Sequence, residues 1–168
     1  MRALMWCLAV AATTGFFSPS VCVRAAEEKV ALEKLPKAVV EAVKKRFPKA
    51  EMKSAEKETE DGKTVYEVAI KDKEQSIEVT LTGEGTIIEI ENQIDAKNLP
   101  KAVSEALEKK YPKATYKMIE EVIKVKDGKE NLEYYEVLLV TADKKKLEVS
   151  VTAEGKISKE EDKSKEKD

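Results

Sequence analysis

The segment LPKAVVEAVKKRFPKA, residues 35–50, returns as LPKAVSEALEKKYPKA at residues 99–114. Eleven of the sixteen positions are identical, at an offset of 64 residues. A second pair, IEVTLTGEGTI at 77–87 and LEVSVTAEGKI at 147–157, follows in the same order at an offset of 70. Two matched blocks in one order indicate a tandem duplication. The sequence therefore predicts two repeats, at residues 28–94 and 95–160.

Each repeat is predicted to begin with a short amphipathic helix. Apolar residues recur every four positions, which places them on one side of a helix: Leu35, Val39, Val43 and Phe47, then Leu99, Val103, Leu107 and Tyr111. Pro36 and Pro100 fit the first helical turn. Pro48 and Pro112 end the helices, because a residue before proline avoids the helical region. Asn98 is the expected N-cap of the second helix.

After each helix the period of the apolar residues changes to two, which is typical of half-buried antiparallel strands. The alternation is strongest at residues 66–70, 77–81, 135–139 and 147–151. Asp61-Gly62 and Asp127-Gly128 are hairpin signals, and strands are expected before them at 52–58 and 116–125. The predicted fold class is α+β, with two tandem repeats, each with one helix packed on a four-stranded antiparallel β-sheet.

The first 25 residues have the pattern of a signal peptide. Arg2 supplies a positive charge, residues 3–17 form a short and mostly apolar run, and Ala25 suits cleavage before Ala26. The alternative is a lipoprotein signal with Cys22 lipidated, although Val21 is bulkier than the residue such sites prefer. We expect a periplasmic or secreted protein that is not bound to the membrane after cleavage. Residues 161–168, within a charged run from Ser158, are expected to be a disordered tail.

Composition excludes several classes of chemistry. The 168 residues include no His and two Cys, both of which lie in the predicted signal peptide. The cleaved chain therefore lacks thiol and imidazole groups for catalysis or metal binding. It also lacks phosphate-loop and serine-nucleophile motifs. We expect no enzyme, no catalytic residues, no cofactor and no metal site.

Nucleic acid is not an expected partner. The net charge of −2 becomes −4 when Arg2 and Arg24 leave with the signal. Basic residues are also mixed with acidic ones instead of forming a stripe.

The repeated block, followed in each repeat by a Tyr-Glu-Val strand and a Glu-Gly hairpin, resembles PepSY-like domains, also described as β-lactamase-inhibitor-like. The resemblance implies small exported domains with a helix on an antiparallel sheet. Tandem pairs resemble β-lactamase inhibitory protein, whose two sheets form a concave protein-binding surface. PepSY relatives are proposed to restrain peptidases or bind proteins at the cell envelope. That inhibitor carries disulfides and the cleaved chain has no Cys, so β-lactamase inhibition is not carried over.

Apolar residues on the strand face turned away from the helix form the candidate partner-binding site. If Val68 and Ile87 point toward the helices, alternation turns their neighbours outward. An exposed apolar patch often marks an interface, although the two repeats could instead use it to pack on each other. The large tyrosines are the expected anchors. The candidate residues are Val65, Ala69, Ile88, Ile90, Tyr116, Tyr134, Leu138 and Val140.

The expected function is an exported, non-catalytic module that binds a protein or peptide, with inhibition as one outcome of that binding. It would use the open sheet face or a strand edge. The partner would be an envelope or extracellular protein or peptide. The alternative is a small-ligand or divalent-cation binder, calcium included, that uses surface carboxylates such as Glu56 and Glu58.

Overall fold

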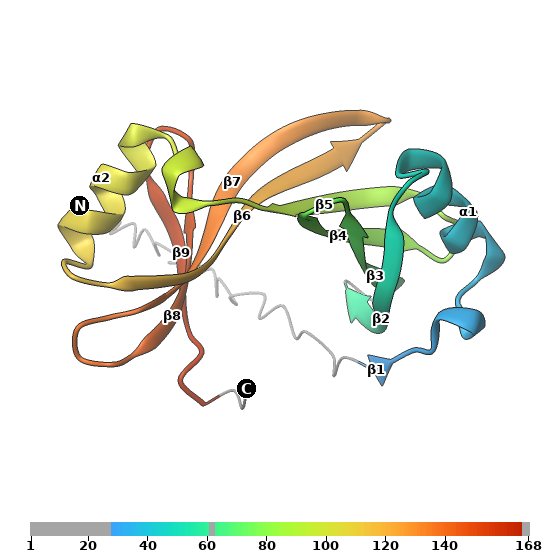
Figure 1. The fold of residues 1–168 in the computed structure, drawn as a ribbon, viewed down its shortest axis with the longest axis horizontal. Helices are drawn as coiled ribbons and strands as arrows, with labels where there is room; N and C mark the ends of the chain where they lie inside the picture. Colours follow the sequence, from blue (N-terminus) through green and yellow to red (C-terminus); the bar gives the residue numbers. More distant parts are fainter. Residues whose placement is uncertain (1–27, 61–62, 166–168) are drawn as a thin grey trace, which may run out of the picture.

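Residues 28–60 and 63–165 are described by a computed structural model of the chain. They form one antiparallel sheet of nine strands, in which each strand pairs with its neighbours in sequence. The helices α1 (Lys37–Arg46) and α2 (Lys101–Lys110) lie at opposite ends of the molecule (Figure 1). A short 3-10 helix precedes each of them, at Leu32–Lys34 and Ala96–Asn98. The strands are β1 (Glu28–Lys29), β2 (Glu51–Glu60), β3 (Lys63–Asp72), β4 (Gln75–Thr82), β5 (Ile87–Gln93), β6 (Thr115–Lys126), β7 (Lys129–Val140), β8 (Lys146–Val151) and β9 (Ile157–Asp162).

Both helices form where the four-residue apolar spacing predicts them. Each begins directly after a proline, Pro36 or Pro100, whose restricted φ is compatible with entry into a helix. Each ends at an aromatic residue, Phe47 or Tyr111, that precedes the next proline. The predicted N-cap is wrong, because Asn98 ends the preceding 3-10 helix and Pro100 occupies the cap position.

Each helix covers a hydrophobic core of its own. Core 1 consists of Leu35, Val39, Val43, Phe47, Ala55, Val68, Ile70, Ile77, Val79, Leu81 and Ile90. Core 2 consists of Leu99, Val103, Leu107, Ile119, Tyr135, Val137, Leu139, Val149 and Val151. The apolar stripes of α1 and α2 and the alternating strand residues supply most of both cores. The helices are therefore held by burial of these side chains, which is the main source of stability for short helices.

The expectation of two separate four-stranded sheets is wrong. β5 pairs with β6, with Ile90 opposite Ile123, so the strands form one continuous sheet. Ile123 and Val125 of the second predicted repeat pack against core 1. Ile94, just after β5, packs against core 2, and its N–H donates to the Ile119 carbonyl at 2.9 Å. The long β6 strand thus belongs to both halves.

Both helices lie on the same face of this sheet. Ile123 contributes to core 1 and Ile119 to core 2, and the two residues are four positions apart on β6. Residues an even number of positions apart along a strand point to the same side. We call the side with both cores the helix face and the opposite side the open face.

A glycine closes the hairpin beside each helix. Gly85 has φ +81° and Gly155 has φ +83°, a left-handed conformation that favours glycine. A Cβ atom on Gly85 would lie 2.5 Å from the Ala38 carbonyl oxygen, and one on Gly155 would lie 2.4 Å from that of Ala102. The repeated Glu-Gly motif therefore permits close packing of each turn against its helix.

Several sequence predictions concern turns and termini. The Asp127-Gly128 hairpin is confirmed, since both residues have positive φ as a type I′ turn requires. Asp61-Gly62, the predicted signal peptide at 1–25 and Cys22 within it lie outside the described residues.

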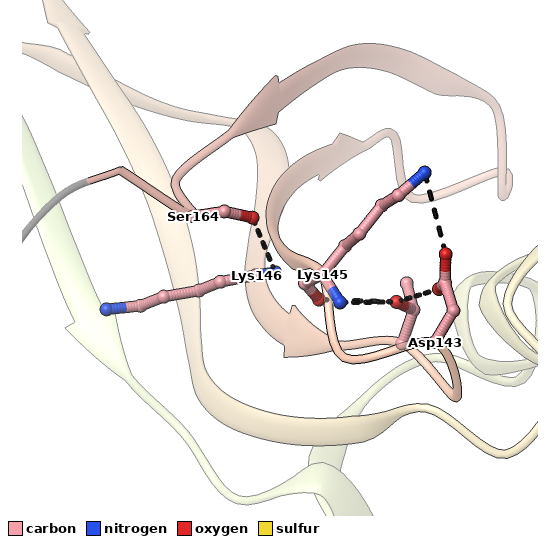
Figure 2. Close-up of polar contacts among 5 residues, drawn as sticks. Asp143, Lys145, Lys146 and Ser164 are labelled. Atoms are coloured by element: carbon pink, nitrogen blue, oxygen red, sulfur yellow. Dashed lines mark hydrogen bonds and ion pairs between the residues drawn. The ribbon is translucent and has the colours of Figure 1, made fainter.

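The charged C-terminal segment differs from the predicted disordered tail. Residues 157–162 form β9, paired with β8. Beyond β9, the Lys163 N–H donates to the Lys146 carbonyl at 2.9 Å. The Lys146 N–H in turn donates to Ser164 Oγ at 3.1 Å (Figure 2). These bonds extend the β8–β9 pairing to Ser164, while Asp143 and Lys145 form an ion pair at 3.5 Å in the turn before β8 (Figure 2).

Candidate functional site

Neither α1 nor α2 covers the open face, since both pack on the opposite side of the sheet. Strand register places on it a mixed set of apolar and acidic side chains. Val65 and Val122 are 3% and 0% exposed, yet neither belongs to a helix core. The central part of the face is therefore shielded from water by side chains of the sheet. Its main members are Val65, Ala69, Glu78, Glu89, Glu91, Met118, Glu120, Val122, Tyr134, Glu136, Leu138, Val140 and Glu148.

Glutamates stand directly opposite each other across neighbouring strands of this face. Glu78 on β4 is opposite Glu91 on β5, and Glu120 on β6 is opposite Glu136 on β7. Directly opposed side chains have Cβ atoms only about 5 Å apart, and like charges there are destabilising. We call Glu78, Glu91, Glu120 and Glu136 the junction glutamates, because they flank the β5–β6 pairing that joins the two halves.

Burial and repulsion by neighbouring acids change the acidity of three junction glutamates, Glu91, Glu120 and Glu136. Burial, then the charges of Glu89 and the other junction glutamates, raises the pKa of Glu91 to about 9. Burial and then neighbouring glutamates also raise the pKa of Glu120 and of Glu136 to about 7, with Lys159 and Lys163 opposing the shift at Glu136. The surroundings of each of these carboxyl groups therefore favour its neutral, protonated form.

Nearby lysines neutralise other acids of the open face. Lys124 pairs with Glu89 across β5 and β6. Lys163, only 8% exposed, lies 3.6 Å from a carboxylate oxygen of Glu148. No hydrogen bond or ion pair from residues 28–60 or 63–165 reaches the carboxylates of the junction glutamates. These four carboxylates form no ion pair with a described residue, although the charges of Lys159 and Lys163 act on Glu136 from a longer distance.

A pocket of about 280 Å³ opens where the two halves meet. Its lining includes Glu78 from β4, Gln93 from β5, and Met118 and Glu120 from β6. Glu120 is 6% exposed, whereas Met118 is 37% exposed. The pocket therefore combines the carboxylate of a largely buried residue with an accessible apolar side chain, and it needs strands from both repeats.

Five of the predicted partner-binding residues lie on the open face: Val65, Ala69, Tyr134, Leu138 and Val140. Val65 is buried, and the other four are half-buried. Burial, followed by repulsion from Glu89, raises the pKa of the Tyr134 phenol. The positions of these residues do not test whether they bind a partner, so their binding role stays a prediction.

Three predicted residues lie elsewhere, and β-bulges are the reason. Ile90 is 2% exposed in core 1, so its predicted outward orientation is wrong. An extra residue at Ile88 shifts the β4–β5 register, so Ile87 and Ile90 both face α1. A second bulge, between Tyr116 and Met118, leaves Tyr116 packed against core 2. Ile88 itself is half-buried within its bulge.

The sequence prediction missed Met118, Glu120 and Val122. All three lie at alternate positions of β6, so the period-two pattern contained the signal. However, the partners of these residues depend on the β5–β6 pairing, which joins two repeats that were expected to form separate sheets.

In the part of the chain that the structure describes, the acidic side chains do not gather into a metal-binding arrangement. There, no three acidic side chains come together closely enough to hold a metal ion. Across the same residues, no helix is long and apolar enough to cross a membrane.

Solved structures share this fold. A BLIP-like protein from Bacteroides fragilis is 19% identical, with a TM-score of 0.58 over 79% of this chain and 89% of that one. A DUF2874 family protein from Bacteroides uniformis is 17% identical, with a TM-score of 0.63 over 79% and 92%. A protein from Bacteroides eggerthii named as "putative periplasmic" is 14% identical, with a TM-score of 0.62 over 76% and 88%. None of the curated proteins matches the chain in sequence.

A family model described as "Putative beta-lactamase-inhibitor-like, PepSY-like" matches the chain twice, at residues 21–89 and 77–159. The two matches span most of the sequence and agree with the internal duplication. The chain belongs to the PepSY-like, β-lactamase-inhibitor-like family.

Proposed function

We propose that this protein is an exported, non-catalytic module that holds a partner protein or peptide on its open face. The observation that carries the proposal is the composition of that face. It combines accessible or half-buried apolar side chains, such as Met118 and Leu138, with carboxylates that form no ion pair with a described residue. Natural sheets with one solvated face usually keep it polar, whereas apolar anchors beside unpaired charges are features of recognition surfaces.

Two further observations support export and binding. The first 25 residues have the pattern of a signal peptide, and one solved relative of the same fold is named as periplasmic. The family is described as "Putative beta-lactamase-inhibitor-like", and an inhibitor of this kind acts by binding another protein.

A sheet edge is a second route to the same function. Residues 28–30 pair with β2 from Ala55 to Lys57, and no other described strand pairs with the outer edge of β2. At the opposite edge, β9 carries Lys159, Glu160, Glu161 and Asp162. Charged side chains discourage pairing of an edge with another strand. Both edges are therefore weaker candidates than the open face, since β2 is charged to a similar degree, at Glu51, Lys53, Glu56, Lys57 and Glu58.

Cation binding is the weaker alternative. Calcium requires six to eight oxygen ligands, and no described group of three acids is arranged to supply them. If the carboxylates bound calcium, adding it would raise the melting temperature. We expect no shift.

A matched pair of leucine variants tests the open-face proposal. Leu138 lies on the open face of β7, and Leu132, on the same strand, pairs with Ile123 of the helix face and is 44% exposed. In pull-downs from an envelope extract, Leu138→Ser should recover the partner at least about fivefold less efficiently than wild type, the loss expected for an interface hot spot. Leu132→Ser should recover it normally. Equal recovery by a folded Leu138→Ser variant would rule out the open face.

A further inference from the structure

The chemistry of the partner can be inferred from the pocket between the two halves, if the proposed function holds. Two acids of the open face have lysine partners, Glu89 with Lys124 and Glu148 with Lys163. The junction glutamates do not. A cluster of acids alone is ordinary on a protein surface, so the inference depends on how one of them, Glu120, is buried.

Glu120 is a largely buried residue whose carboxylate reaches the pocket and has no hydrogen-bond or ion-pair partner among the described residues. It is 6% exposed and lines the pocket, and no described residue donates a hydrogen bond to it or forms an ion pair with it. Its direct neighbour across β7 is another acid, Glu136. Burial and the neighbouring acids disfavour the charged form of Glu120, so a cationic donor that enters the pocket would stabilise this carboxylate.

The lysines at the pocket are engaged elsewhere. Lys53 lines it, but its Nζ lies 2.7 Å from a carboxylate oxygen of Glu51. Lys71 also lines it, and its Nζ donates to the Glu74 carbonyl oxygen at 2.8 Å. These contacts direct both ammonium groups to Glu51 and Glu74, and neither lysine forms an ion pair with Glu78 or Glu120.

The apolar lining narrows the choice of ligand. Met118 and Ala69 line the pocket beside Glu120 and Glu78. A metal ion would gain nothing from them, and no described group of three acids could complete its coordination. A lysine or arginine side chain uses both features, since its apolar stem packs on carbon while its charged end pairs with carboxylate.

We propose that this pocket receives a lysine or arginine side chain from a basic segment of the partner protein. Glu120 and Glu78 accept hydrogen bonds from the ammonium or guanidinium group, while Met118 contacts the stem. The adjoining open face, with Leu138 and Tyr134, contacts the rest of the segment. A protein segment fits better than a small free amine, because these apolar side chains extend beyond the pocket.

Proton release provides an additional readout. The charged groups that act on Glu120 are Glu78 from β4, Glu136 from β7 and Glu148 from β8, and the lysines at the pocket come from β2 and β3. Burial and these acids raise the pKa of Glu120 to about 7. A bound cation favours the carboxylate, so binding near neutral pH releases a proton. The measured binding enthalpy will then depend on the ionisation enthalpy of the buffer.

The test is calorimetric titration of the purified protein at low salt with a peptide of about ten residues that carries a lysine at every third position. Its counterpart has every lysine acetylated. The Glu120→Gln variant keeps the shape of the side chain and removes the charge. Glu105→Gln is the matched control, since Glu105 is exposed on α2 and pairs with Lys101. Melting curves verify that both variants are folded.

We expect the lysine peptide to bind and its acetylated counterpart not to bind. Glu120→Gln should weaken binding by roughly tenfold to thirtyfold, the effect of removing one partner of a buried charge pair, and Glu105→Gln should have no effect. Absence of binding, equal binding of the acetylated peptide, or equal affinity of Glu120→Gln would each overturn the proposal. Spermidine that binds as tightly as the peptide would overturn it in favour of a small amine.

The two proposals can fail separately. If Leu138→Ser loses the envelope partner while Glu120→Gln retains it, the open face binds but the basic chemistry is wrong. If both variants retain the partner, the open face is not the binding site and both proposals are wrong.

Discussion

Arg46 at the end of α1 and Glu130 near the tip of the β6–β7 hairpin connect the two halves of the molecule. Arg46 Nε lies 3.0 Å from Glu130 Oε1, and the guanidinium also donates to Oε2 at 3.3 Å. The hairpin starts in the second repeat and reaches the helix of the first (Figure 1). In the second repeat, Lys110 and Tyr111 at the end of α2 contact Glu160 of β9 instead. The end of α1 thus contacts a strand of the other repeat, whereas the end of α2 contacts a strand of its own repeat.

The Arg46–Glu130 pair should contribute modestly to stability. Both side chains are more than two-fifths exposed, so a double-mutant cycle with Arg46→Ala and Glu130→Ala should give a coupling energy of about 0.5–1 kcal/mol. Urea unfolding measures it. The control is the Lys37–Glu41 pair within α1, which is more exposed and 3.6 Å apart. A coupling no larger than that of the control would show that the inter-repeat contact is not stabilising.

Gly155 should be more sensitive to substitution than Gly128. Both have positive φ, but only at Gly155 would a Cβ meet backbone, 2.4 Å from the Ala102 carbonyl oxygen. We expect Gly128→Ala to cost about 1 kcal/mol and Gly155→Ala about 3 kcal/mol or more. Chemical denaturation gives both values. Similar losses would contradict the close packing of this turn on α2.

Stability should fall as pH rises from about 5 to 9. Glu91, Glu120 and Glu136 have folded pKa values of about 9, 7 and 7, above the ordinary 4.5. In this window the folded state holds protons that the unfolded state has released, so the free energy of unfolding decreases with pH. Carboxyls with lowered pKa, such as Asp162 and Glu160, titrate below the window.

The size of this pH-dependent loss of stability can be checked on Glu120. Allowing for partial solvation, Glu120 should contribute about 1–2 kcal/mol of the loss between pH 5 and 8. Denaturant titrations at several pH values should show a shallower decrease for Glu120→Gln than for wild type. A wild-type stability that increases over this range would mean that the junction glutamates are well solvated.

Ile123 should couple the two halves, because it lies on β6 and packs against core 1. Ile123→Ala removes partly buried apolar volume and should cost about 1–2 kcal/mol. Hydrogen exchange should increase in β3 and β4 as well as in β6. An increase confined to β6 and β7 would indicate that the halves unfold independently.

Local features of the fold were predictable from sequence. The spacing of Val39 and Val43, the prolines on either side of each helix and the Asp127-Gly128 turn act within a few residues. The internal repeat then indicated that the same unit occurs twice, as the two family matches agree. These signals depend on near neighbours, which the sequence displays directly.

The candidate site was less predictable, because it depends on register. A single extra residue at Ile88 turns Ile90 from the open face into core 1, and alternation alone does not reveal a bulge. Glutamates are abundant throughout the chain, so the sequence alone does not distinguish Glu120 from the others. Its position between Gln93 and Glu136 depends on the pairing of β6 with β5 and β7.

Site-specific photocrosslinking tests most directly whether the open face is the binding surface. A photoreactive residue replaces Met118, which is exposed beside the junction glutamates, or Lys109, which is exposed on α2. In cells that export the protein, we expect a discrete adduct from position 118 and none from position 109. Adducts from position 109 with none from 118 would place the partner on the helix face and contradict the account.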